Sequence, residues 1–275
     1  LGYGALSENT TASNNTAVGY VALLANTTGQ YNVAVGSLAL DANTTASQNT
    51  ALGYAALSTN ITGSDNTALG KGTLFANTAS NNTAVGTSAL TANTTGTANV
   101  AVGSLSGDAL TTGHYNTMMG HGSLSADTKG TRSVAIGMQA LAAQNFTSET
   151  SVYNTAVGFQ AGLSVTTGTE NTLIGATAGD LMTTGSSNTS VGYFSMSNAV
   201  VTGNDNTAVG KSAGYNLTSG SNNLFLGHDA GFTGSPGGNI TTGSNAIVLG
   251  DENIGDAHIQ VDWTVASDAR DKTDF

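Results

Sequence analysis

The chain has 275 residues, of which 39% are hydrophobic but only 6% aromatic and 8% charged, and glycine occurs 37 times. Because large side chains are scarce, we expect a thin, regular core in place of a thick globular one. The net charge of −11 argues against nucleic acid as a partner, since phosphate backbones are held chiefly by Lys and Arg. No apolar run approaches the roughly 18 residues of a membrane-spanning helix, so we expect no membrane insertion.

A short sequence motif, here also called a phrase, recurs along almost the whole chain. Residues 15–19 read Asn-Thr-Ala-Val-Gly, and residues 32–36, seventeen positions later, read Asn-Val-Ala-Val-Gly. The glycine that ends each phrase, called here the repeat glycine, stands at positions 2, 19, 36, 53, 70, 86, 103, 120, 137, 158, 175, 192, 210, 227 and 250. So constant a period predicts a structural repeat, with one unit forming one coil of a solenoid. Because position 1 already lies inside a unit, we expect further sequence upstream.

Each unit predicts short strands. The residues before the repeat glycine are β-branched or apolar on alternate positions and are bounded by turn formers, which is typical of a strand. A second small apolar pair follows the glycine, such as Ala22-Leu23 or Ala39-Leu40, and a polar turn such as Asn-Thr-Thr-Gly comes next. We therefore expect two short strands and two turns per coil. Each coil would enclose one Val or Leu, one or two Ala, and in some units a further Leu.

Stacking would place each side chain above its equivalent in the next coil, about 4.8 Å away. The residue four positions before the repeat glycine is Asn in nearly every unit, with Ser133 as the exception. This column predicts a ladder of amides that hydrogen-bond along the stack, and ordinary turn chemistry is the alternative. Both roles are structural. The column consists of Asn15, Asn32, Asn49, Asn66, Asn82, Asn99, Asn116, Asn154, Asn171, Asn188, Asn206 and Asn223.

The sequence thus predicts an all-β fold, a parallel β-roll or β-solenoid over residues 1–250. About fifteen coils at roughly 4.8 Å each would make a rod about 70 Å long. A single coil encloses little apolar volume, so we expect association to supply the missing burial. A homotrimeric fibre is the preferred arrangement.

Two steps between repeat glycines are longer than the others. The first contains an insertion at residues 142–153 and the second an insertion at residues 228–243. Extra residues in a solenoid form loops on one face, where binding functions are frequent. Phe146, Tyr153 and Phe232 are therefore candidate receptor contacts, and plain insertions without a binding role are the alternative.

The repeats stop after position 250. Residues 251–266 form a candidate capping region, because residues 257–263 alternate between apolar and polar like a half-buried strand. Its Trp263 is interpreted as a packing anchor that closes the end of the stack.

Other chemical signals are weak. The Gly-Lys-Ser at residues 210–212 lacks the upstream glycine of a phosphate-binding loop. The histidines at positions 114, 121, 228 and 258 lie far apart in sequence, so we expect no metal site and no cofactor. Asn-x-Thr triplets, for instance at Asn26 and Asn43, are glycosylation acceptors in a eukaryotic secretory pathway. Closely spaced coils would tolerate such glycans poorly, which favours a bacterial or viral origin.

The repeat unit, read as Asn-Thr-Ala-Val-Gly-Tyr at residues 15–20 with the apolar pair that follows, resembles the head repeats of trimeric autotransporter adhesins. This chain has a longer unit, and Asn mostly replaces the Ser of those repeats. The resemblance covers roughly residues 1–250. It implies a trimeric, left-handed parallel β-roll.

The end of the chain carries a second resemblance. Residues 263–275 resemble the opening of the peptidase S74 intramolecular chaperone domain, found at the C-termini of phage tail fibres and tailspikes. Ser267-Asp268, Arg270 and Lys272 match its Ser-Asp-x-Arg-x-Lys start. In that family the chaperone helps three chains to register and then cuts itself off. The resemblance implies that residues 267–275 begin the cleaved domain, that Ser267 is the nucleophile, that Lys272 accepts its proton, and that the Ser267–Asp268 bond is cut.

These features predict a structural protein of the virion, the shaft or distal part of a bacteriophage tail fibre that attaches to a host receptor, a glycan among the candidates. Apart from one self-cleavage we expect no enzymatic activity. The first alternative is a trimeric adhesin stalk on a bacterial cell surface. The second is an ice-binding β-solenoid, because regular Thr columns would form a flat array of hydroxyl and methyl groups. A polysaccharide-degrading tailspike would need paired carboxylates in a groove, and no such pair is evident.

Overall fold

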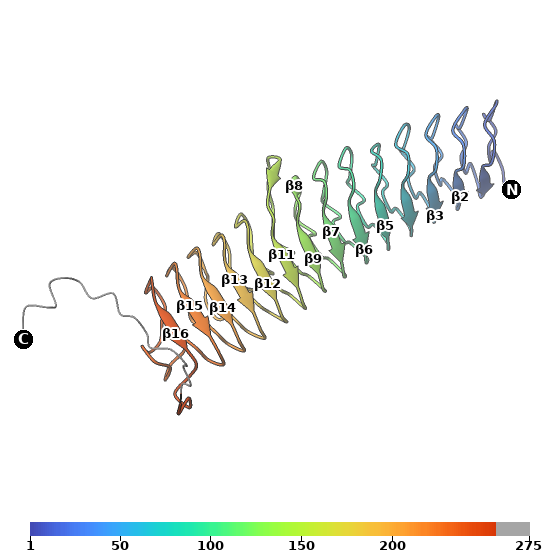
Figure 1. Ribbon diagram of the computed structural model, residues 1–275. Coiled ribbons are helices and arrows are strands. Elements are labelled where there is room, and N and C mark those ends of the chain that lie inside the picture. Colours follow the sequence, from blue (N-terminus) through green and yellow to red (C-terminus); the bar gives the residue numbers. More distant parts are fainter. Residues whose placement is uncertain (257–275) are drawn as a thin grey trace, which may run out of the picture.

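The computed structural model describes residues 1–256 and shows a parallel β-solenoid, a slender rod whose coils stack from one end to the other (Figure 1). The predicted fold class is therefore confirmed. Residues 257–263, Trp263 and the proposed cleavage residues Ser267 and Lys272 lie outside the described part. Within residues 1–256, no helix is long and apolar enough to cross a bilayer.

One strand from each coil enters a single parallel sheet of fourteen strands in the order β1-β2-β3-β4-β5-β6-β7-β9-β11-β12-β13-β14-β15-β16. Strands β8 and β10 form a separate parallel pair within the first insertion. At about 4.8 Å between strands, the main sheet is about 60 Å long. The strand bounds are β1 Thr16–Val18, β2 Val33–Val35, β3 Thr50–Leu52, β4 Thr67–Leu69, β5 Thr83–Val85, β6 Val100–Val102, β7 Thr117–Met119, β8 Gly130–Thr131, β9 Val134–Ile136, β10 Thr150–Ser151, β11 Thr155–Val157, β12 Thr172–Ile174, β13 Thr189–Val191, β14 Thr207–Val209, β15 Leu224–Leu226 and β16 Ile247–Leu249.

Every strand pairs with its neighbour at the equivalent position of the repeat, as Ala34 does with Ala51. The repeat glycine follows the strand and marks a close approach of two backbones. A Cβ added at Gly103 would lie 2.5 Å from the carbonyl oxygen of Gly120. Gly103 also has a φ of 137°, which side chains disfavour. Stacking and backbone conformation thus both require glycine here.

The predicted second strand is wrong. The segment after the repeat glycine alternates between right-handed and left-handed backbone, with φ of 50° at Val21 and 54° at Leu23. Its hydrogen bonds still run between coils, since the backbone N–H of Leu23 donates to the carbonyl of Ala39 at 3.0 Å. A left-handed leucine costs about 1–2 kcal/mol, which its full burial offsets. Nothing in the residue types distinguishes this zigzag from an extended strand.

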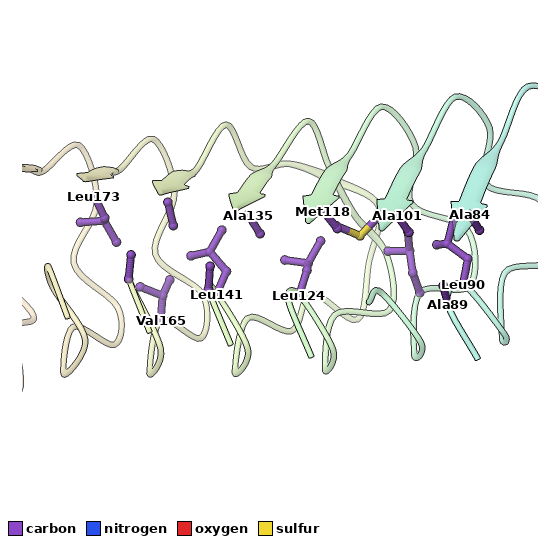
Figure 2. Packing of buried hydrophobic residues seen from close by; sticks show 14 of the residues in the cluster. Ala84, Ala89, Leu90, Ala101, Met118, Leu124, Ala135, Leu141, Val165 and Leu173 are labelled. Carbon is purple, nitrogen blue, oxygen red and sulfur yellow. The ribbon is translucent and has the colours of Figure 1, made fainter. Parts of the chain in front are cut away.

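The core is a narrow file of small side chains running along the rod (Figure 2). The middle residue of each strand points inward, as Ala84, Ala101 and Ala135 do. Leu90 and Leu141, from the opposite segment, fill the remaining space. The interior is therefore as thin as the composition predicts.

Bulky and small core positions compensate one another along the file. Leu173 occupies the middle strand position, which is usually Ala. Four residues after the repeat glycine most coils carry a core leucine such as Leu23, but the two coils beside Leu173 carry Gly162 and Gly179 there. A Cβ at Gly162 would lie 2.7 Å from Leu173 Cδ1, and one at Gly179 would lie 2.9 Å from Leu173 Cδ2. Met118 fills the space beside Gly107 in the same way. Core volume is thus shared between neighbouring coils.

The Val or Leu before the repeat glycine is not enclosed, in contrast to the prediction. Because side chains alternate across a strand, the inward Ala forces the residue that follows it to point outward. Val18 is 40% exposed and Leu52 is 48% exposed. A single coil therefore buries even less apolar surface than its composition suggests.

Candidate functional site

Each Asn of the predicted ladder joins its coil to the next through both ends of its amide. Asn99 Oδ1 accepts from the backbone N–H of Asn116 at 3.0 Å, and Asn99 Nδ2 donates to the carbonyl of Gly113 at 2.9 Å. Both partners lie in the following coil. All members except half-buried Asn15 are buried. The ladder and the turn chemistry are therefore one arrangement. In it the side-chain amides bond backbone N–H and carbonyl groups that would otherwise be buried without partners.

The ladder changes chemistry at Ser133, which replaces Asn in the middle of the stack. Ser133 still donates its backbone N–H to Asn116 Oδ1 at 2.9 Å. Its short side chain does not reach the next coil, and Gln144 bridges the gap. Gln144 Nε2 donates to Ser133 Oγ at 3.1 Å, and Gln144 Oε1 accepts from Asn154 Nδ2 at 2.9 Å. Gln144 belongs to the first insertion, so part of that insertion serves the core.

A second amide ladder runs inside the coils and was missed at the sequence level. Asn43 Nδ2 donates to Asn26 Oδ1 at 2.9 Å, and Asn93 Nδ2 donates to Asn77 Oδ1 at 2.7 Å. The ladder is interrupted after Asn60, whose Oδ1 is buried without a partner. It ends at Asn93, because Leu110 takes the place of Asn in the next coil and leaves Asn93 Oδ1 without a partner as well. This ladder is built from the Asn of the polar turns, and its members are Asn26, Asn43, Asn60, Asn77 and Asn93. All five are fully buried, so the folded chain cannot accept glycans on them.

The outward residues of the main sheet form one continuous apolar strip, here called the outer strip. Large exposed apolar surfaces are uncommon on monomeric proteins and mark interaction sites. The first residue of most strands is Thr, and these residues form a second column that flanks the strip. The outer strip consists of Val18, Val35, Leu52, Leu69, Val85, Val102, Met119, Ile136, Val157, Ile174, Val191, Val209, Leu226 and Leu249, each half-buried or exposed.

Aromatic residues follow several of the repeat glycines and extend this surface. Tyr20 is 56% exposed, and its ring stacks on that of Tyr3 with 5.6 Å between centroids. Tyr54, Phe159 and Tyr193 occupy the same position in other coils and are also exposed. The sequence signal for them is the residue directly after the repeat glycine.

The two predicted contact residues of the first insertion differ in their exposure to solvent. Phe146 is buried, and its backbone N–H donates to Asp127 Oδ1 at 3.0 Å. Tyr153 is 53% exposed and lies beside Arg132, whose guanidinium carbon is 5.8 Å from the Tyr153 ring centroid and 5.5 Å from that of Tyr115. Of the two predicted contact residues in this insertion, only Tyr153 is therefore exposed.

The second insertion carries Phe232, which is half-buried and packs edge-on against Tyr215 with 5.4 Å between centroids. At the base of this insertion, stacking brings His228 next to Asp229 and Asp251. The sequence predicts no metal site because its four histidines lie far apart, whereas this cluster combines one histidine with two aspartates. The available signal was that His228 and Asp251 both directly follow a repeat glycine.

The cleavage pair Ser267 and Lys272 lies outside the described residues, so its geometry stays a prediction. Comparison with known proteins finds no matching family model, no matching curated protein and no matching solved structure. The fold class and the surfaces described above therefore carry the functional argument.

Proposed function

We propose that this chain is the shaft of a homotrimeric fibre, with a bacteriophage tail fibre as its setting and host attachment as its role. The single observation that carries the proposal is the outer strip, which runs along the whole main sheet. Three rods that face one another across this strip would bury it from end to end. The surfaces left to solvent would then be the polar turns and the two insertions.

The thin core supports this assignment energetically. Burying apolar surface stabilises by about 25 cal/mol per Å², and the inward file of Ala residues leaves each coil with little of it. Half-exposed Val, Leu, Ile and Met side chains on the outer strip are available to supply the rest. Association would therefore contribute stability that one rod lacks.

Repetition also makes a registering device necessary. Equivalent strands are nearly identical, as the pairing of Ala34 with Ala51 and of Ala51 with Ala68 shows. A trimer in which one chain is shifted by one coil would thus lose little stability, so the repeats specify the register only weakly. A C-terminal chaperone of the type implied by residues 263–275, removed by a cut between Ser267 and Asp268, would set the register and leave a kinetically stable rod.

The oligomeric state tests the proposal. We expect sedimentation equilibrium of the 275-residue chain to give three times its mass of 27.2 kDa. Charges on the outer strip, in the double variant Val102→Lys and Ile136→Lys, should reduce the mass to that of one chain. The control adds the same charges in exposed turns, Thr62→Lys with Thr95→Lys, and should stay trimeric. A parent protein that sediments as a monomer contradicts the proposal.

The same surface favours one competing function. Thr83 and Val85 of β5 and their equivalents set a mostly Thr column beside an aliphatic column, which is the flat array that the ice-binding alternative needs. That function requires the array to be free, whereas a trimer would cover it. Thermal hysteresis of a monomeric parent protein would support the ice-binding role. A trimer without hysteresis supports the fibre. The adhesin stalk shares the trimer and differs in where the protein is anchored.

A further inference from the structure

Three metal-ligating side chains meet at the base of the second insertion. His228 Nδ1 lies 3.2 Å from Asp251 Oδ2 and 3.5 Å from Asp229 Oδ2. One nitrogen and two carboxylate oxygens thus lie within 4.8 Å of one another. Within residues 1–256, no other group of three histidine or acidic side chains comes together in this way.

The register of the sheet produces this cluster. Leu226 of β15 pairs with Leu249 of β16, and two residues further along, His228 and Asp251 stand in adjacent coils at the position after the repeat glycine. Asp229 is fixed by its backbone N–H, which donates to the carbonyl of Lys211 at 3.0 Å. The insertion of residues 228–243 lies between the two coils, so the cluster joins its first residues to the coil that follows it.

Hydrogen bonds from Asn253 hold the Asp251 carboxylate in position. Asn253 donates its backbone N–H to Asp251 Oδ1 at 2.9 Å and its side-chain amide to Asp251 Oδ2 at 3.2 Å. The Asp251 side chain is only 15% exposed, against 52% for His228. The Asp251 carboxylate is thus held in place beside an accessible imidazole.

The distances fit a small divalent cation. Bonds of about 2.0–2.1 Å in tetrahedral geometry place ligand atoms about 3.3 Å apart, close to both contacts of His228 Nδ1. An imidazole nitrogen with two carboxylates suits first-row transition metals, whereas Ca²⁺ takes six to eight oxygen ligands. Two carboxylates this close also repel each other, and a dication removes that repulsion.

We propose that His228, Asp229 and Asp251 bind one divalent first-row transition cation, which fastens the base of the second insertion to the following coil. The remaining coordination positions are open to water. All three ligands belong to one chain, so the site does not depend on trimer formation.

Zinc serves as the probe. The full chain is treated with a chelator, dialysed and titrated with ZnCl₂ in a calorimeter, with CaCl₂ in parallel. We expect one Zn²⁺ per chain, binding at least 100-fold weaker in His228→Ala and in Asp251→Asn, and no comparable Ca²⁺ binding. His121→Ala is the matched control, because His121 is an exposed histidine that also directly follows a repeat glycine. It should bind Zn²⁺ like the parent.

Two further readouts separate a site from loss of folding. Zn²⁺ should raise the thermal unfolding temperature of the parent and of His121→Ala, but not that of Asp251→Asn. In the unaltered chain, Zn²⁺ should protect His228 from acylation by diethylpyrocarbonate and leave His121 reactive. Unchanged Zn²⁺ affinity in a folded Asp251→Asn variant, or equal reactivity of both histidines, would overturn the proposal.

Discussion

The backbone N–H of Asn116 donates to the side-chain oxygen of Asn99 across 3.0 Å, one coil away. The same Asn99 amide donates to the carbonyl of Gly113. One side chain therefore satisfies two buried backbone groups that its own coil cannot reach. This explains why the residue returns in nearly every unit, since only an amide of this length both donates and accepts at that position.

Replacing Asn99 with Ala should destabilise the fold by about 2–6 kcal/mol, because two buried backbone groups lose their partner at about 1–3 kcal/mol each. The free energy of unfolding in urea measures the loss. Asn198→Ala is the control, since Asn198 is exposed and bonds only the Asn216 side chain. It should change stability by less than about 0.5 kcal/mol. Equal losses in both variants would show that the ladder contributes nothing special.

A methyl group at a repeat glycine should block stacking. In Gly103→Ala the Cβ would lie 2.5 Å from the carbonyl oxygen of Gly120, and neither backbone can move without breaking the ladder. We expect circular dichroism to show loss of β-structure or a strongly lowered unfolding temperature. Gly122→Ala is the control, because its φ is also positive but its Cβ would meet no atom nearer than Gln139 Cγ, at 3.8 Å. It should cost about 1–2 kcal/mol, because alanine disfavours the left-handed backbone at this position. A folded Gly103→Ala variant as stable as Gly122→Ala would contradict the close approach.

Truncating Leu173 should open a cavity, because Gly162 and Gly179 contribute no side chain beside it. Leu173→Ala is expected to cost about 2–5 kcal/mol, as for other buried leucines. Leu181→Ala removes the same atoms from an exposed position and should cost much less. Comparing the two denaturation midpoints isolates the cavity. A small loss at Leu173 would mean that the neighbouring coils collapse into the space.

The sequence predicts the fold well where chemistry repeats in a strict register. The repeat glycines locate every coil, and the Asn column predicts a ladder whose geometry the structure supplies. The second segment was predicted wrongly, because Leu23 and its equivalents are apolar in strands and in left-handed zigzags alike. The outer strip escaped prediction for a related reason. The sequence pattern does not show whether Ala17 or Val18 faces the core. In the structure the strand and the opposite segment of the coil lie too close for a larger side chain, so Ala17 points inward and Val18 points outward.

The cluster at His228 could not be found from local spacing, since its members are separated by an insertion. Only the alignment of repeat glycines across that insertion places His228 beside Asp251. The cleavage pair is the opposite case. Ser267 and Lys272 are suggested by local sequence alone, and their geometry lies outside the described residues.

Acid should stabilise the rod through Asp180. Burial raises the pKa of Asp180 despite the hydrogen bond that Ser197 donates to it. Because the folded pKa is above the unfolded one, the protonated form favours folding. This stability is fully present below the unfolded pKa and is lost as the pH rises through the folded pKa. Burial raises the pKa of Asp108 in the same direction.

Asp180→Asn keeps an acceptor for Ser197 but removes the charge. We expect the variant to unfold at a higher temperature than the parent at pH 7 and at about the same temperature at pH 3, as followed by circular dichroism. Glu8→Gln is the control, since it removes one negative charge at an exposed position and so matches any general relief of the net charge of −11. If both variants gain equally at pH 7, repulsion over the whole molecule explains the effect. A gain confined to Asp180→Asn identifies the half-buried Asp180 carboxylate as its source.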